Sequence, residues 1–192
     1  NLLQGFTKPE EHENKLELAQ QYLDNGEYDK ALSMANSYLS NHANDSDALA
    51  IKGQSYLGKA GAGISDILSR IGGNKETTSN FNALSILKSS KLDDLYTAAS
   101  ILKQLHSTDQ DVQLSEGIAC MLAAVHKVTW TFDPIDGKLG DGSSAEPLPG
   151  ADVSGMWGTI KTDVLSYSVA GAAAIAAATG HDELKQEATS IN

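Results

Sequence analysis

The sequence is poor in cysteine and in basic residues, and each shortage excludes a class of protein. The single cysteine, Cys120, excludes an internal disulfide. Its place in an apolar run predicts a buried structural thiol. Only 14 Lys and Arg residues stand against 25 Asp and Glu residues, giving a formal net charge of -11. Nucleic acid and anionic membranes are therefore not expected as main partners, because binding to either depends on clustered cations.

Long hydrophobic runs are also missing. No stretch of about 18 apolar residues is free of polar interruption, so the sequence predicts no membrane-spanning helix. The 192 residues suffice for one domain or a small repeat array. The start at Asn1 lacks a signal peptide and would suit a mature lipoprotein without its anchoring cysteine. This predicts a periplasmic or outer-membrane-anchored bacterial protein, with a cytoplasmic location as the alternative.

A spacing of 34 residues relates two segments in the first third of the chain. It pairs Ala19 with Gly53 and Tyr22 with Tyr56. A shift of 64 residues extends the pattern, because it places Gly53 on Gly117 and the stretch 46–48 on 110–112. Repeat starts then fall near residues 12, 46, 76 and 110, with the second copy about four residues short.

Apolar residues recur at steps of three and four, and strand-like alternation is nearly absent, so the chain is predicted to be all-α. Asn25-Gly26 is expected to end the first helix, and the stretch 44–47 offers capping oxygens to a later one. The expected organisation has four parts: an N-terminal extension (1–11), helical repeats (12–132), a loop rich in Gly, Pro and Asp (133–150), and a C-terminal helical cap and tail (151–192). Within the last part, separate helices are expected over 151–167 and 169–179.

Over residues 12–126 the chain resembles the tetratricopeptide repeat (TPR) family. The resemblance rests on the period, on small residues at the eighth repeat position and on bulky ones at the eleventh: Ala19, Gly53, Ala83 and Gly117, then Tyr22, Tyr56 and Ile86. The family's tryptophan is absent at Lys15 and Leu49, and Ala43 stands where a proline closes each repeat. The resemblance implies a right-handed, TPR-like solenoid of antiparallel helical hairpins. The C-terminal helical segment lies outside the resemblance, and we expect it to cap the last repeat.

In this family, the first helices of the repeats line a groove that takes peptides. Carried over by position, the groove-facing residues would be Glu13, Leu16, Gln20, Leu23, Asp24, Asp47, Ala50, Gln54 and Leu57. This mixture of Leu, Gln and acid would suit an extended peptide of some basic character. The alternative is that these residues form ordinary solvated helix faces.

Motifs that would carry catalysis or bind a cofactor are not found. The five histidines are scattered, and no nucleophile elbow or phosphate-binding loop is present. His126 is expected to be partly buried. One candidate metal site remains, formed by Asp133, Asp136 and Asp141, where carboxylates alternate with glycines as in calcium loops. An ordinary loop explains the same residues, because Asp-Gly pairs form turns.

Together these features favour a non-enzymatic adaptor that binds a protein or peptide partner. The alternative is a small-molecule-binding accessory protein of a solute-transport system, with a cavity between the repeats and the C-terminal segment. A deep apolar pocket lined by Trp130, Trp157 and Tyr167 would favour the second function. An open groove with exposed Leu23 and Leu57 would favour the first.

Overall fold

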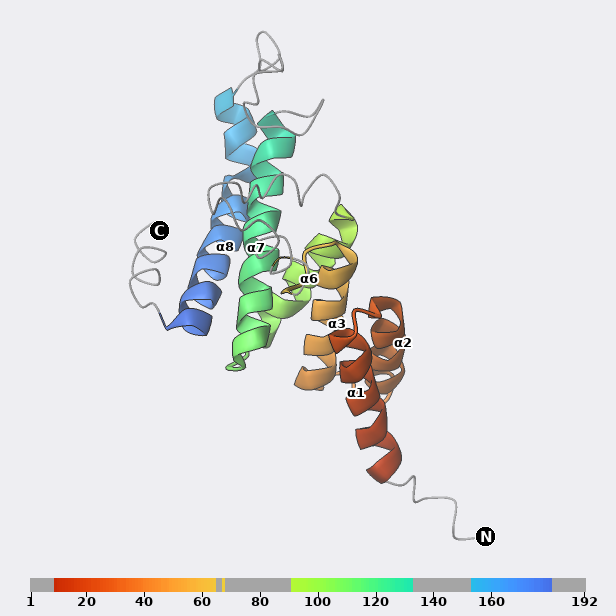
Figure 1. Cartoon of the computed structure of the whole chain (residues 1–192). Helices are drawn as coiled ribbons and strands as arrows, with labels where there is room; N and C mark the ends of the chain where they lie inside the picture. Colours follow the sequence, from red (N-terminus) through yellow and green to blue (C-terminus); the bar gives the residue numbers. More distant parts are fainter. Residues whose placement is uncertain (1–8, 65–66, 68–90, 133–152, 181–192) are drawn as a thin grey trace, which may run out of the picture.

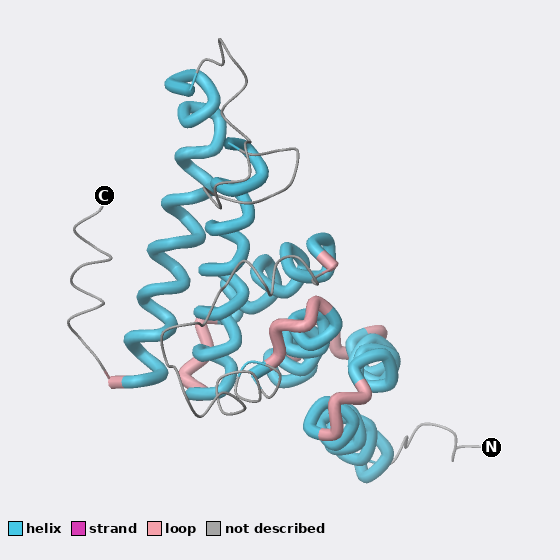
Figure 2. Tube along the Cα trace, turned by 45° about the horizontal axis from the view of Figure 1, so that its top comes forward, coloured by secondary structure: helices cyan, strands magenta, loops and turns pink. Residues whose placement is uncertain are grey.

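The regular structure is entirely α-helical in the part of the chain that the computed structural model describes, residues 9–64, 67, 91–132 and 153–180 (Figures 1 and 2). The helices are α1 (Pro9–Asp24), α2 (Tyr28–Leu39), α3 (Ser46–Lys59), α6 (Leu92–Leu105), α7 (Gln110–Phe132) and α8 (Val153–Thr179). The predicted all-α class is therefore confirmed. Helix α1 begins at Pro9, within the expected N-terminal extension, and proline suits the first position of a helix.

The helices pack in chain order: α1 on α2, α2 on α3, α3 on α6, α6 on α7, and α7 on α8. Helices α7 and α8 run antiparallel, side by side, and project beyond the rest of the molecule (Figure 1). The prediction of two separate helices over 151–167 and 169–179 is wrong, because the single helix α8 runs from Val153 to Thr179. Ser168 does not break a helix that packs along a neighbour. None of the helices in the described ranges is long and apolar enough to cross a membrane.

Glycines in the left-handed conformation end α1 and α3, and the end at Gly26 confirms the sequence prediction. Gly26 (φ 73°) follows α1, and the N–H of Glu27 donates to the carbonyl of Tyr22 at 2.8 Å. Gly61 (φ 75°) follows α3, where the N–H of Ala62 donates to the carbonyl of Leu57 at 3.1 Å. Both are Schellman ends, in which the left-handed residue turns the chain back over the last helical turn.

The hydrophobic core has two clusters. The smaller joins α1, α2 and α3 through Ala19, Ala31, Ala35 and Ile51. The larger joins α3, α6 and α7 around Leu57, Leu95, Leu102 and Cys120, with Tyr167 and Ala170 of α8 against it. Cys120 is fully buried, as predicted, and burial raises the pKa of its thiol to about 12. A thiol in this state is an inert packing group.

Small residues at the eighth repeat position lie where neighbouring helices come close together. A Cβ atom added at Gly53 of α3 would stand 2.7 Å from the Leu102 side chain of α6. One added at Gly117 of α7 would stand 2.4 Å from Ile175 and 3.1 Å from the carbonyl oxygen of Gly171, both in α8. Ala19 is fully buried in the smaller cluster. The predicted Ala83 lies outside the described residues.

Two glycines of α8 provide a matched test of this packing. We expect Gly158→Ala to raise the free energy of unfolding by about 0.5–1 kcal/mol, because its Cβ meets nothing and alanine favours helix. Gly171→Ala should instead lower it by about 1–3 kcal/mol, since its Cβ would stand 3.1 Å from backbone atoms of α7. Urea unfolding followed by circular dichroism measures both. Stabilisation by both variants would contradict the close packing of α7 and α8.

Candidate functional site

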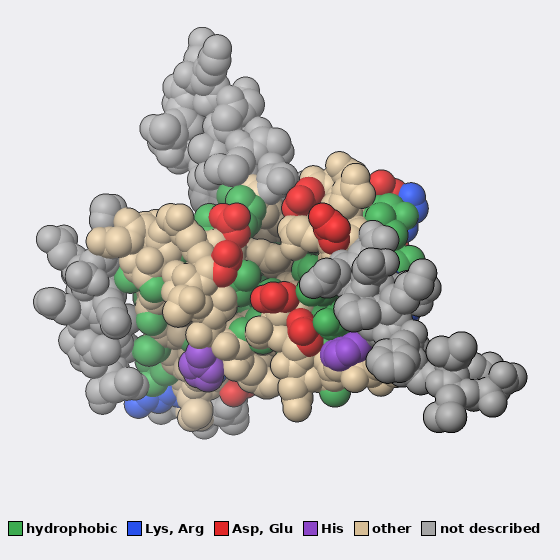
Figure 3. Space-filling model, turned by 90° about the horizontal axis from the view of Figure 1, so that it is seen from below, with side chains coloured by type: hydrophobic (Ala, Val, Ile, Leu, Met, Phe, Trp, Pro, Cys, Tyr) green, Lys and Arg blue, Asp and Glu red, His purple; other side chains and the backbone are tan. Residues whose placement is uncertain are grey.

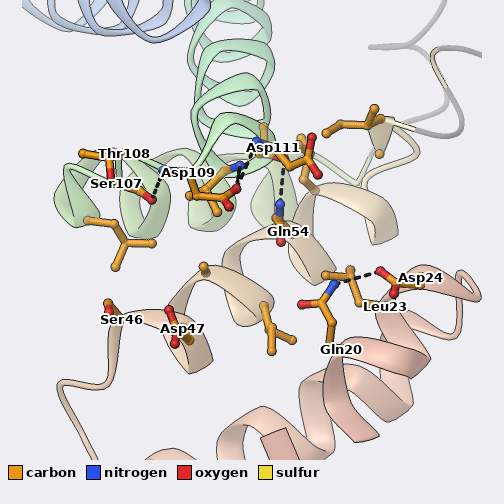
Figure 4. Close-up of a pocket in the computed structure, with 18 of the residues that line it drawn as sticks. Gln20, Leu23, Asp24, Ser46, Asp47, Gln54, Ser107, Thr108, Asp109 and Asp111 are labelled. Atoms are coloured by element: carbon orange, nitrogen blue, oxygen red, sulfur yellow. Dashed lines mark hydrogen bonds between the residues drawn. The ribbon is translucent and has the colours of Figure 1, made fainter. Parts of the chain in front are cut away.

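A groove of about 770 Å³ opens between α1, α3 and the start of α7 (Figure 4). We call it the central groove. Helix α1 and the start of α2 supply one wall, α3 supplies the floor, and the segment from the end of α6 into α7 supplies the other wall. Its lining residues are Gln20, Leu23, Asp24, Tyr28, Ser46, Asp47, Ala50, Ile51, Gln54, Leu57, Gly63, Ile64, Leu105, His106, Ser107, Thr108, Asp109, Asp111, Val112 and Ser115.

Most residues that the repeat register selected lie on this one surface: Gln20, Leu23, Asp24, Asp47, Ala50, Gln54 and Leu57. Leu16 is not among the lining residues and packs, like Leu23, against the smaller core cluster. Leu57 is only 1% exposed, so it belongs to the floor and offers little surface to a ligand. Leu23 is half-buried and remains accessible. The side chain of Glu13 lies outside the described residues.

The wall formed by the end of α6 and the start of α7 was not among the sequence-selected residues. It contributes a run of small polar residues, 107–109, and the acidic Asp111 (Figure 4). The signal for Asp111 was present, because the shift of 64 residues places it on Asp47. His106 precedes this run with φ 49°, a left-handed conformation that directs the chain from α6 into α7.

The groove is acidic. Asp24, Asp47, Asp109 and Asp111 line it, and no Lys or Arg is among the described residues that do. Seen from below, acidic side chains gather over the middle of this face, with hydrophobic groups between them (Figure 3). The Lys and Arg side chains visible there lie at the edges (Figure 3). The surface therefore favours a cationic ligand and disfavours an anionic one.

Helices α3 and α7 begin with the same arrangement of two aspartates. Asp45 caps α3 by accepting the N–H of Ala48 at 2.9 Å, which confirms the capping predicted for 44–47. Asp109 caps α7 by accepting the N–H groups of Asp111 and Val112 at 3.0 and 3.1 Å. The second aspartates, Asp47 and Asp111, lie in the first helical turn. Their carboxylates form no hydrogen bond or ion pair with the described part of the chain.

A side-chain contact connects the floor of the groove with α7. The Gln54 amide donates to Ser115 Oγ at 3.1 Å, and Ser115 donates in turn to the carbonyl oxygen of Asp111 at 2.8 Å. Ser115 is only 1% exposed and Gln54 is half-buried, so this contact is partly shielded from water. Gln54, which the sequence suggested as a ligand-binding residue, thus has a structural partner that holds α3 and α7 together.

The described part of the chain contains no cluster of side chains suited to bind a metal ion. No three His, Cys, Asp or Glu side chains come together there closely enough to hold an ion. The acidic groups of the central groove are accordingly spread along its walls. The candidate calcium residues Asp133, Asp136 and Asp141 lie outside the described residues.

A second polar cluster lies where α6, α7 and α8 meet. The Tyr96 hydroxyl and His126 Nδ1 are 2.7 Å apart, and the Tyr96 and Tyr167 rings are 6.2 Å apart. Lys127 of α7 forms an ion pair with Asp163 of α8 at 3.1 Å. His126 is half-buried, as predicted. Burial, and then the Lys127 ammonium, lower the pKa of its imidazole. The side chains of Trp130 and Trp157 lie outside the described residues.

Comparison with known proteins gives no relative. No protein-family model matches the chain, and no match is found among curated proteins or solved structures.

The lowered pKa of His126 predicts a pH-dependent stability. Unfolded chains take up a proton near the ordinary pKa of 6.5, whereas the folded chain takes it up only at lower pH. Stability should therefore fall as the pH falls below 6.5 and be unaffected by this residue above it. His126→Gln keeps a hydrogen-bonding group towards Tyr96 and should lose less stability between about pH 7 and pH 5.5. Parallel pH profiles of urea unfolding for the two proteins would contradict this account.

Proposed function

We propose that the protein is a non-enzymatic adaptor of the tetratricopeptide type, which holds an extended segment of a partner protein in the central groove. The observation that carries the proposal is the common position of register-equivalent residues. Gln20 and Leu23 of α1 share the surface with Gln54 of α3, one repeat length further along the chain. Asp111 of α7 extends it into the next wall.

The shape and chemistry of the groove support a peptide ligand. Three separate parts of the chain form its two walls and its floor, and the lining combines half-buried aliphatic side chains at Leu23, Ile64 and Leu105 with polar ones. Extended peptides bind such surfaces through hydrophobic anchors, while polar neighbours select the register.

The alternative is a small-molecule-binding accessory protein of a solute-transport system. The volume of the groove, about 770 Å³, falls in the range of small-molecule sites. Such sites are predominantly apolar, however, whereas the lining here includes four carboxylates and several hydroxyl groups. The peptide is therefore the better fit.

Leu23→Glu tests the adaptor function. Panning a random-peptide display library on the immobilised wild-type protein supplies the probes. We expect the enriched peptides, resynthesised with a fluorophore, to bind Leu23→Glu at least about tenfold more weakly, because a hydrophobic anchor is lost and a charge is added. Fluorescence anisotropy measures the dissociation constants. Leu23 is preferred to Gln54 because Gln54 also joins α3 to α7.

Leu39→Glu is the matched control. Leu39 is half-buried like Leu23 but lies on α2, outside the central groove. It should leave the dissociation constants unchanged within about twofold, and circular dichroism should show equal helicity for all three proteins. An absence of enriched peptides, or enriched peptides that bind Leu23→Glu as well as the wild type, would refute the proposed function.

A further inference from the structure

The two aspartates that begin α3 and those that begin α7 have divided roles. In each pair the first carboxylate, Asp45 or Asp109, is occupied by backbone N–H groups of its own helix. The second, Asp47 or Asp111, lines the central groove and has no partner among the described residues. Two register-equivalent carboxylates are thus directed to the same surface from neighbouring helices.

This division of roles determines whether the groove favours a positively or a negatively charged ligand. The first turn of a helix ordinarily attracts anions, because its N–H groups are unpaired and the helix dipole is positive there. Here the capping carboxylates already accept from those N–H groups. A phosphate or carboxylate ligand would meet four aspartates and no Lys or Arg in the described lining. Only a cationic ligand gains from the arrangement.

The spread of the carboxylates decides the shape of the ligand. No three of them converge on one point in the described structure, so a single metal ion cannot collect them. In the close-up, Asp24 lies on the α1 wall, Asp47 lies on the floor formed by α3, and Asp109 and Asp111 lie on the other wall (Figure 4). Cations carried at intervals along one chain would reach separate carboxylates. The aliphatic groups of Leu23, Ile64 and Leu105 line the same groove and can hold an apolar side chain.

The helices that carry the two carboxylates are held together before any ligand arrives. The hydrogen bond of Gln54 to Ser115, and that of Ser115 to the backbone of Asp111, hold the start of α7 against α3. A ligand therefore does not bear the entropic cost of ordering these helices.

We propose that the occupant of the central groove is a partner segment in which two Lys or Arg side chains flank an aliphatic one, with the cations paired to Asp47 and Asp111. This inference rests on the proposed function and specifies its partner. It commits to a peptide, since a free polyamine would leave the aliphatic side chains of the groove uncovered.

Charge-neutral variants of the full chain test it. Asp47→Asn and Asp111→Asn keep the side-chain shape but remove one charge each. Asp93→Asn is the matched control, because Asp93 lies in the first turn of α6, is exposed and does not line the groove. The probes are fluorescent, acetylated peptides of about nine residues, long enough to span about 30 Å. One alternates Lys with Leu, a second carries Gln for Lys, and a third carries Ser for Leu. Spermine is the competitor.

We expect the Lys-Leu peptide to bind the wild type and to bind Asp47→Asn and Asp111→Asn about threefold to fivefold more weakly, as for partly exposed ion pairs. The double variant should lose about tenfold or more, and Asp93→Asn less than about twofold. Added salt should weaken binding to the wild type more than to the double variant. The Gln and Ser peptides should both bind more weakly than the parent.

The outcomes separate the two claims. If no peptide binds, including those from library panning, the proposed function falls and this inference falls with it. If library peptides bind but carry no excess of Lys or Arg, or if Asp47→Asn and Asp111→Asn behave like Asp93→Asn, only the charge pairing is overturned. Binding of spermine as tight as that of the Lys-Leu peptide, with no loss in the Ser peptide, would also overturn it, because the ligand would then be a small polycation.

Discussion

The close approach of helices at Gly53 and Gly117 is the constraint on which the rest of the structure depends. At Gly53, α6 comes so near to α3 that a methyl group would collide with Leu102. At Gly117, α7 touches α8 almost backbone to backbone. Because α6 packs directly on α3, the end of α6 lies near the start of α3. The first turns of α3 and α7 therefore come together at one face, and the central groove is the space between them and α1.

The carboxylates at the starts of α3 and α7 cost the folded state little stability. A carboxylate in the first turn of a helix is stabilised by the helix dipole, so Asp47 and Asp111 are tolerated although no cation accompanies them among the described residues. The ion pairs that the described chain does contain lie elsewhere, as between Lys59 and Asp29 at 2.7 Å and between Lys127 and Asp163. The ion-paired charges of the described chain are thus separate from the carboxylates of the central groove.

Much of this arrangement could be predicted from the repeat spacing of the sequence. The spacing identified Gly53 and Gly117 as small residues at contact positions. It also predicted that Gln20, Leu23, Asp24, Asp47 and Gln54 share one surface, and all five line the central groove. It did not foresee that Leu16 packs inward, because a register position does not tell which of two adjacent faces a neighbouring helix covers. Repeat spacing did not predict the hydrogen bond of Gln54, because its partner Ser115 lies 61 residues away in the sequence. The continuity of α8 was missed because packing along α7 outweighs the local weakness of Ser and Gly.

Among the described helices, α3 contributes to both hydrophobic clusters, since Ile51 belongs to one and Ala50 and Leu57 belong to the other. Chains built in this linear way unfold in parts, because each cluster loses few contacts when the other opens. The central groove borders both clusters, with Leu23 on one side and Val112 on the other. An occupant would therefore act as a clamp that makes the α1–α2 pair and the α6–α8 block unfold as a single cooperative unit.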